Sequence, residues 1–299
     1  MPELGEVEWY RKRWDPALGH RVQAVFLHPR CRIFRGLDTE ALVNALDGAT
    51  PVASAARAKQ MLFEFRKTRG TCWLGIHLGM SGKLRVVKGK AFENYRSAKH
   101  DHLVLLQENQ CAVFTDTRHF GRVLFHQGKT PPEWWTSLPP DIVGDAFTTE
   151  VVAAFCRRRT RSPLKAVLLM QERFPGIGNW MADEILWRAG LHPARHAGSL
   201  SEAEMRTLWK ETRWVAREAL KRIGTKWKRL PDSWLFNHRW AKGRTCPKTG
   251  AALVREKIGG RTTCWSPGCQ PPPGTFKKGP HELVQGGRPG HAAKKFTYP

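Results

Sequence analysis

Short apolar runs separated by turn residues or charges mark the chain from about residue 20 to residue 125. In chain order the runs read RVQAVFLH, QMLFEF, TCWLGIHL, KLRVV, HLVLL, CAVF and RVLFH. Several short strands at this spacing are typical of a β-sandwich or barrel. Helical patterns at residues 5–15 and 38–46 accompany them, and Asp38 is placed to cap the second helix.

The pattern changes after a proline-rich stretch that contains Pro131, Pro132, Pro139 and Pro140. From residue 148 apolar residues recur at steps of three and four, as they do in amphipathic helices. The helical segments read TTEVVAAFCRRR, PLKAVLLMQE, NWMADEILWRAG and SEAEMRTLWKETRWVAREALKRI. The sequence therefore predicts an α+β protein. Its predicted parts are a β-domain at 1–130, a linker at 131–147, a helical domain at 148–236, a loop-rich piece at 237–270 and a disordered basic tail at 271–299.

The charge of the chain narrows the choice of partner. It has 299 residues and a formal net charge of +24, with basic residues spread along its whole length. Such a field attracts polyanions, so nucleic acid is the first partner to consider and an anionic membrane surface the second. No apolar run approaches the roughly 20 residues of a membrane-spanning helix, and we see no signal peptide. We therefore expect a cytoplasmic protein, at the nucleoid in a bacterium, with reduced cysteines.

Two glycines precede one of the predicted helices, in FPGIGNWMADEIL (residues 174–186). Gly176 and Gly178 permit a tight turn, and the free N–H groups of a helix start can then bind an anion such as phosphate. Asn179 is placed to cap this helix and to donate to the same phosphate. The alternative is a helix–turn–helix corner in which glycine serves only geometry.

The segment TCPKTGAALVREKIGGRTTCWSPGCQ (residues 245–270) has the layout of a zinc ribbon, in which two CxxC pairs supply four ligands. One cysteine of each pair is replaced, because Thr249 follows Cys246 and Ser266 precedes Cys269. Neutral hydroxyls are poor zinc ligands, although Cys264 leaves a rearranged site open. We expect no bound metal and no other cofactor. The residues expected to pack the hairpin instead are Leu253, Ile258 and Trp265.

Taken in order, several segments resemble one family: the formamidopyrimidine-DNA glycosylases and endonuclease VIII-like enzymes of base-excision repair. The segments are MPELGEVE, RAKQMLFEF, HLGMSGKL, KHDH, FTDTRHFG, PGIGNWMADEILWRAGLHP and the terminal hairpin, which span nearly residues 1–270. The resemblance implies an N-terminal β-sandwich, a helix–two-turn–helix domain and a zinc-ribbon-like hairpin. It also implies a monomer that binds double-stranded DNA containing damaged bases or abasic sites.

The resemblance gives the chain start a chemical role. Removal of Met1 would free the secondary amine of Pro2, and a terminal amine titrates near pH 7.7–8.0. Such an amine can attack C1′ of a nucleotide, displace the base and form a Schiff base, after which β- and δ-elimination cut the strand. Glu3 resembles the family's general acid/base and Glu6 a carboxylate that orients the terminus. Gly5 stands where the family usually has Pro, and we expect it to loosen the backbone there.

Other roles follow by position. Lys59 resembles the family's lysine beside the lesion, and it forms the expected phosphate contacts together with His77, Asn179 and Arg261. The residues that match the family's void-filling triad are Met80, Arg118 and Phe120. Core packing is the alternative for Met80 and Phe120. Lys165 either adds to the basic face or is solvated surface, whereas His102 and His119 are expected to be structural.

The lesion is the least determined feature. The opening and the void-filling residues favour formamidopyrimidine or 8-oxoguanine lesions, although the stretch at about 223–245 is atypical and leaves oxidised pyrimidines or bulky adducts open. Two further alternatives remain: a catalytically weak protein that binds damaged DNA, and an RNA-binding module that needs only the charge.

Overall fold

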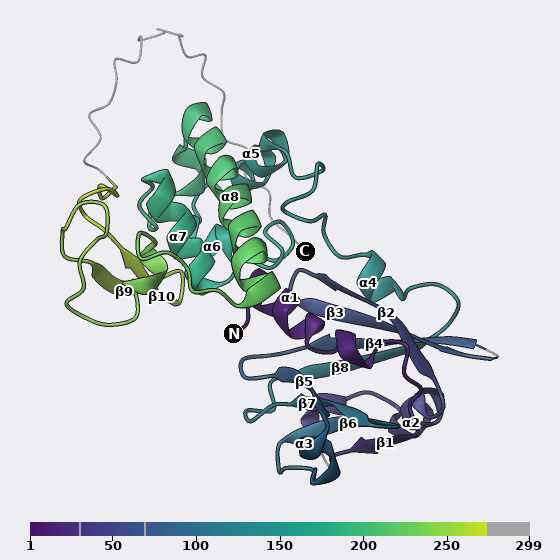
Figure 1. Cartoon of the computed structure of the whole chain (residues 1–299). Helices are drawn as coiled ribbons and strands as arrows, with labels where there is room; N and C mark the ends of the chain where they lie inside the picture. Colours follow the sequence, from purple (N-terminus) through teal and green to yellow (C-terminus); the bar gives the residue numbers. More distant parts are fainter. Residues whose placement is uncertain (30, 69, 274–299) are drawn as a thin grey trace, which may run out of the picture.

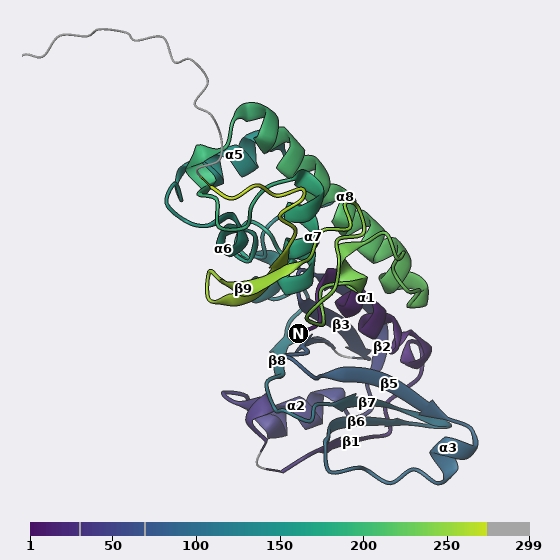
Figure 2. The same ribbon diagram turned by 90° about the vertical axis from the view of Figure 1, so that its left-hand side faces the viewer.

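The computed structural model describes residues 1–273 except residues 30 and 69 (Figure 1). A β-sandwich forms one part of the molecule, and a group of helices with a small hairpin forms the other. The chain start lies where the two parts meet, as both ribbon views show (Figures 1 and 2). Most of the expected basic tail lies outside the described residues.

The β-sandwich consists of two four-stranded antiparallel sheets. Their strand orders are β1-β6-β7-β5 and β2-β3-β4-β8. The strands are β1 (Ala24–Leu27), β2 (Thr50–Arg57), β3 (Gln60–Lys67), β4 (Gly70–His77), β5 (Lys83–Lys88), β6 (Asp101–Gln107), β7 (Gln110–Thr115) and β8 (Arg122–Gln127). Apolar side chains from both sheets fill the space between them, and Phe63, Leu74 and Phe114 are almost completely buried. All seven apolar runs therefore form strands, as predicted.

The α-helices of the described residues are α1 (Leu4–Lys12), α2 (Thr39–Leu46), α3 (Lys90–Glu93), α4 (Glu133–Thr136), α5 (Thr149–Arg157), α6 (Leu164–Leu168), α7 (Asn179–Ala189) and α8 (Glu202–Lys226). Short 3-10 turns lie at Asp15–Ala17, Arg32–Phe34, Ala197–Ser199 and Leu235–Asn237. The Asp38 side chain accepts from Ala41 N at 3.0 Å, which confirms the predicted cap of α2. The C-terminal hairpin pairs β9 (Val254–Ile258) with β10 (Arg261–Trp265).

Helix α1 crosses the junction and packs against α8, which joins the chain start to the helical part. Gly5 lies in this contact. A Cβ at Gly5 would stand 2.6 Å from the backbone oxygen of Ala219 and 3.3 Å from Cβ of Ile223. Real Cβ atoms do not approach a backbone atom so closely, so Gly5 is required by the close approach of the two helices.

Gly5→Ala should destabilise the protein by about 1–3 kcal/mol, because the added methyl overpacks against an immobile helix backbone. Gly224→Ala is the matched control, since Gly224 lies in the same contact but faces the movable Glu8 side chain at 3.2 Å. Urea unfolding followed by circular dichroism measures both variants. Equal stability of the two variants would contradict the packing role of Gly5.

Candidate active site and DNA-binding cleft

A cleft of about 850 Å³ lies between the sandwich and the helical part. Nine of the residues singled out in the sequence line it together: Pro2, Glu3, Glu6, Lys59, His77, Met80, Gly178, Asn179 and Arg261. They come from the chain start, the sandwich, α7 and the hairpin. Arg118 and Phe120 are not among the lining residues and lie on a separate loop.

Glu3 is held by the start of α7. Its carboxylate accepts hydrogen bonds from Gly178 N at 2.9 Å, Trp180 N at 2.9 Å and Met181 N at 3.1 Å. The glycine-rich turn therefore does build an anion site, but a carboxylate from the chain's own start fills it. The expectation of a phosphate at these N–H groups is wrong, because all three already donate to the Glu3 carboxylate.

The electrostatics of Glu3 suit proton transfer. Burial, together with the nearby Glu6 carboxylate, raises its pKa to about 7, although the backbone donors work against this rise. Glu6 Oε2 accepts from Glu3 N at 2.6 Å, and burial raises the pKa of Glu6 as well. A carboxyl group that titrates near neutrality can both give and take a proton at physiological pH.

Lys59 and His77 approach the cleft from the ends of neighbouring strands. Lys59 lies just after Ala58, whose positive φ of 56° marks a tight turn, and donates from Nζ to Ile177 O at 2.7 Å. Burial lowers the pKa of Lys59. His77 Nδ1 accepts from Gly79 N at 3.1 Å, which leaves Nε2 as the donor of the ring, and burial lowers its pKa.

Asn179 and Arg261 connect α7 with the hairpin. Gly178, and not Asn179, is the N-cap of α7. Asn179 Nδ2 donates to Thr262 O at 2.9 Å, while its Oδ1 is buried with no hydrogen-bond partner among the described residues. Arg261 is exposed directly after Gly259 and Gly260, whose positive φ angles of 59° and 76° form the hairpin tip.

The three void-filling candidates are exposed on two adjoining loops. Met80 is 42% exposed and Phe120 is 52% exposed, so the alternative of core packing is wrong. The Arg118 guanidinium lies 4.9 Å from the centre of the Phe120 ring. Asp116, fully buried, accepts from Gly121 N at 2.7 Å and from the Ser81 hydroxyl, and thereby ties both loops together.

Comparison with known proteins shows which family has this arrangement. The N-terminal domain model of formamidopyrimidine-DNA glycosylase matches residues 1–123, and the H2TH domain model of the same enzyme matches residues 138–229. Formamidopyrimidine-DNA glycosylases from Alkalilimnicola ehrlichii and Xanthomonas euvesicatoria are each 34% identical, over 90% of this chain and all of theirs. The chain belongs to the formamidopyrimidine-DNA glycosylase family.

Solved structures agree with this assignment. A Lactococcus lactis formamidopyrimidine-DNA glycosylase bound to DNA with an oxidised pyrimidine superposes with a TM-score of 0.80 at 25% identity, covering 91% of this chain and 100% of that one. The Lactococcus lactis enzyme bound non-covalently to DNA with an abasic site gives a TM-score of 0.78 at 25% identity, covering 90% of this chain and 100% of that one. The α+β fold of sandwich, H2TH helices and hairpin is thereby confirmed.

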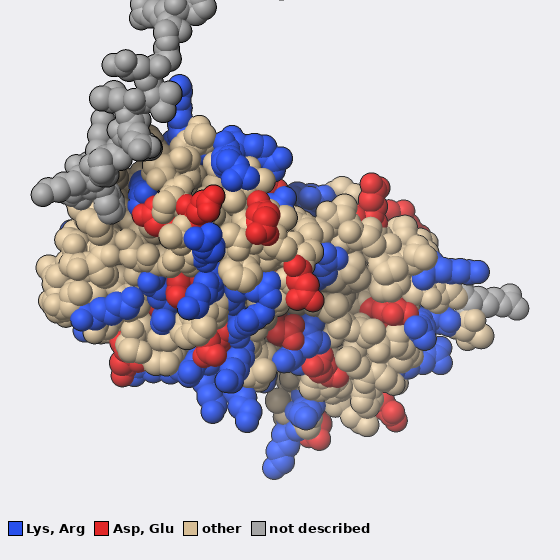
Figure 3. Space-filling model, turned by 90° about the horizontal axis from the view of Figure 1, so that it is seen from above, with Lys and Arg blue, Asp and Glu red and all other residues tan. Residues whose placement is uncertain are grey.

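The charge of this family member is visible on its surface. Figure 3 shows many Lys and Arg side chains on the face seen from above, with Asp and Glu scattered among them. No helix among residues 1–273, leaving out 30 and 69, is long and apolar enough to cross a membrane. The surface and the fold both fit a polyanionic partner.

Four aromatic side chains that the sequence did not place line the cleft: Tyr10, Trp180, Trp227 and Trp240. Trp227 is 47% exposed and Trp240 is 56% exposed. Trp227 contacts Tyr10 edge-on at 6.1 Å between ring centres. Trp227 and Trp240 lie in the atypical stretch at 223–245, and this position was the sequence signal that could have predicted their place in the cleft. Exposed aromatic residues beside basic ones are suited to stacking on bases.

Lys165 is neither basic face nor solvated surface, so both expectations for it are wrong. It is completely buried, forms an ion pair with Asp183 and donates to Asn179 O at 2.7 Å. Asp183 also accepts from Arg239 at 2.6 Å and from Cys264 N at 3.0 Å. This buried network fastens the hairpin and the preceding loop to α7.

The hairpin has an apolar base. All seven cysteines are free thiols, and Cys246 packs with Cys264, Trp187 and Leu235. Leu253 packs against this cluster, and Ile258 and Trp265 are buried. Burial tends to raise the pKa of the Cys246 thiol, but hydrogen bonding, which includes donation from Trp187 Nε1 at 3.3 Å, lowers it to about 6.

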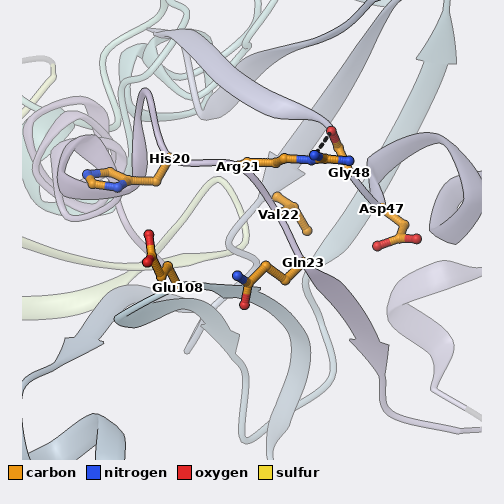
Figure 4. Close-up of a pocket in the computed structure, with 7 residues that line it drawn as sticks. All are labelled: His20, Arg21, Val22, Gln23, Asp47, Gly48 and Glu108. Carbon is orange, nitrogen blue, oxygen red and sulfur yellow. Dashed lines mark hydrogen bonds between the residues drawn. The ribbon is translucent and has the colours of Figure 1, made fainter.

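A second hollow of about 600 Å³ lies on the sandwich (Figure 4). Its lining includes His20, Arg21, Asp47 and Glu108, and Arg21 donates to Gly48 O at 3.2 Å. None of the residues singled out for catalysis or DNA binding lines it. The cleft at the chain start is therefore the candidate active site.

Glu3→Gln should change how the stability of the protein depends on pH. The folded chain holds a proton on Glu3 up to about pH 7, whereas the unfolded chain loses it near the ordinary value of 4.5. The folded state thus binds more protons in this window, and its stability falls as the pH rises. Glutamine cannot ionise, so the free energy of unfolding should fall less between about pH 5 and about pH 8 in Glu3→Gln than in the wild type.

Urea unfolding at several pH values measures this difference. Glu202→Gln, at a side chain that is 93% exposed, should follow the wild type. If the free energy of unfolding of Glu3→Gln fell with pH as steeply as that of the wild type, Glu3 would not titrate as described.

Proposed function

We propose that this chain is a bifunctional DNA glycosylase and AP lyase that removes oxidised bases, of the formamidopyrimidine or 8-oxoguanine type, from double-stranded DNA. The observation that carries the proposal is a buried carboxyl group with a pKa of about 7, one residue from Pro2, in the cleft between the two parts of the molecule. The names of the relatives at 34% identity support the same lesion class.

Pro2 is the proposed nucleophile once Met1 has been removed. Its unprotonated nitrogen attacks C1′, the bond from C1′ to the base breaks, and the departing base takes up the proton that the proline nitrogen loses. The bond from C1′ to the ring oxygen then breaks, and C1′ and the proline form a cationic iminium. Protonated Glu3 supplies a proton to the ring oxygen as the sugar opens. Loss of a C2′ proton then expels the 3′ phosphate, and a second elimination releases the sugar from the 5′ phosphate.

Glu6 and Lys59 position these groups. Glu6 holds the backbone of Glu3 through its 2.6 Å hydrogen bond, which fixes the direction of the chain start. Lys59 has a lowered pKa and lies beside Ile177, so it is suited to act next to the lesion as well as on a phosphate. Gly5 does not weaken the proposal, because it serves helix packing.

The DNA-binding roles follow the walls of the cleft. Lys59, His77, Asn179 and Arg261 are the proposed phosphate contacts, and such contacts position DNA without reading its sequence. Met80 and Phe120 are the proposed wedges that fill the space of an extruded base, and Arg118 is the proposed partner of the orphaned opposite base. Trp227 and Trp240 offer rings on which the extruded base can stack.

The hairpin is proposed to fold without zinc. The four positions of the family's finger hold Cys246, Thr249, Ser266 and Cys269, and two neutral hydroxyls do not suit a tetrahedral zinc site. Packing around Trp187 and the ion network at Asp183 support the hairpin instead. Arg261 can then reach DNA from a metal-free hairpin.

Borohydride trapping on duplexes with formamidopyrimidine, 8-oxoguanine, an oxidised pyrimidine or an abasic site tests the function. Wild-type protein should give a covalent band that falls sharply in Pro2→Gly, and Glu3→Gln should slow base release by about 10²–10⁴-fold. Lys90→Ala, in α3 of the sandwich, should behave as wild type. Mass spectrometry of the intact chain confirms that Met1 is absent.

The outcomes separate the alternatives. Most product on the oxidised-pyrimidine duplex would change the lesion class. No band on any duplex, from chains without Met1, would leave a protein that binds damaged DNA without cutting it. If the protein bound the damaged duplexes only as weakly as it binds RNA, the RNA-binding alternative would be favoured.

Arg261→Ala should weaken DNA binding and reduce the slope of log affinity against log salt by about one unit, because one phosphate contact is lost. Lys90→Ala removes a charge from α3 and should leave the slope unchanged. Fluorescence anisotropy on an abasic duplex at several salt concentrations measures both. An unchanged slope in Arg261→Ala would exclude the proposed contact at the hairpin tip.

A further inference from the structure

One cluster of side chains that the mechanism does not use includes a residue of the loop that carries Arg118 and Phe120. It consists of Cys31, His102 and His119, whose potential ligand atoms all lie within 4.8 Å of one another. No other group of three such side chains was found in the part of the chain that the structure describes. Cys31 precedes a 3-10 turn, His102 lies in β6, and His119 lies between Arg118 and Phe120.

The spacing of the donor atoms fits a tetrahedral metal. Cys31 Sγ lies 3.2 Å from His102 Nδ1 and 3.7 Å from His119 Nδ1. Zn–S and Zn–N bonds of about 2.3 Å and 2.05 Å at a tetrahedral angle give an S···N separation of about 3.6 Å. The two observed distances lie on either side of this value.

The backbone aims these rings at the sulfur. His102 sits at the irregularity in the β6–β7 pairing between Asp101 and Leu103, a place where a strand can redirect a side chain. Its Nε2 is 2.7 Å from Asp116 O, which leaves Nδ1 with its lone pair towards Cys31. Metal-binding histidines are typically oriented through their second nitrogen in this way. His119 has a φ of 56°, a conformation uncommon outside glycine.

A fourth donor is close. The His100 ring centre lies 6.0 Å from that of His119, and His100 Nδ1 is buried with no hydrogen-bond partner among the described residues. The thiol of Cys31 is not activated as a nucleophile, because burial raises its pKa. A metal ion would displace that proton and bind the thiolate.

We propose that Cys31, His102 and His119 form a zinc site that fixes the loop carrying Arg118 and Phe120. A Cys-His₂ donor set with one further position suits zinc over magnesium or calcium, which prefer oxygen ligands. The site is separate from the hairpin cysteines. The effect of the site on DNA binding, through the loop that carries Arg118 and Phe120, rests on the proposed function, but metal binding itself does not.

Titration of the full chain with Co²⁺, followed by its visible and near-ultraviolet absorption, tests the site. Wild-type protein should bind one equivalent with the bands of tetrahedral cobalt bound to a thiolate, and Zn²⁺ should displace it. Cys31→Ser and His119→Ala should each weaken Co²⁺ binding by more than about tenfold to hundredfold. That range is the usual cost of losing a residue that only orients a metal ligand.

The double variant Cys246→Ser/Cys269→Ser is the matched control, and it should keep both the bands and the stoichiometry. Circular dichroism verifies that each variant is folded, and both Cys31 and His119 are partly exposed, so their replacement spares the core. Bands that persist in Cys31→Ser and His119→Ala, or that vanish only in the hairpin variant, would overturn the proposal. Absence of the bands from wild-type protein would overturn it too, and would leave Cys31 and the two histidines as a hydrogen-bonded cluster only.

Discussion

The buried hydrogen bonds between the Glu3 carboxylate and the first amides of α7 hold the candidate active site together. They join the chain start, which carries the proposed nucleophile, to the start of α7 in the helical domain, which carries Asn179, one of the proposed phosphate contacts. The burial that makes these bonds possible also raises the pKa of the carboxyl group. One arrangement thus supplies both the alignment of the two domains and a proton donor near neutrality.

A second set of buried charges extends this alignment to the hairpin. Lys165 in α6 and Arg239 in the loop before the hairpin both pair with Asp183 in α7. Asp183 also accepts from the backbone of Cys264 in β10. Removing one member would leave an unpaired buried charge, which is costly. The position of Arg261 in the hairpin therefore depends on this buried network.

Periodicity and turn residues predict most of the fold, but not the contacts that depend on distant segments. Strand β2 has no clear signal in the sequence, because TPVASAAR contains few large apolar residues, and its pairing with β3 at the edge of the sheet holds it in place. The glycine turn before α7 is evident from the sequence, yet its ligand is not, because Glu3 lies far away along the chain. The burial of Lys165 is equally hidden, since Asp183 pairs with it only in the folded chain. The grouping of Cys31 with His102 and His119 leaves no local signature at all.

The contact at Gly5 bears on how such a sequence can evolve. The atom nearest to a would-be Cβ is a backbone oxygen of α8, which no side-chain replacement can move away. Any residue with a Cβ at position 5, proline included, would require α8 to shift as a whole. The effect of a substitution at residue 5 therefore depends on the position of α8, so the two are epistatic. Once α1 and α8 pack this closely, glycine at residue 5 is difficult to replace.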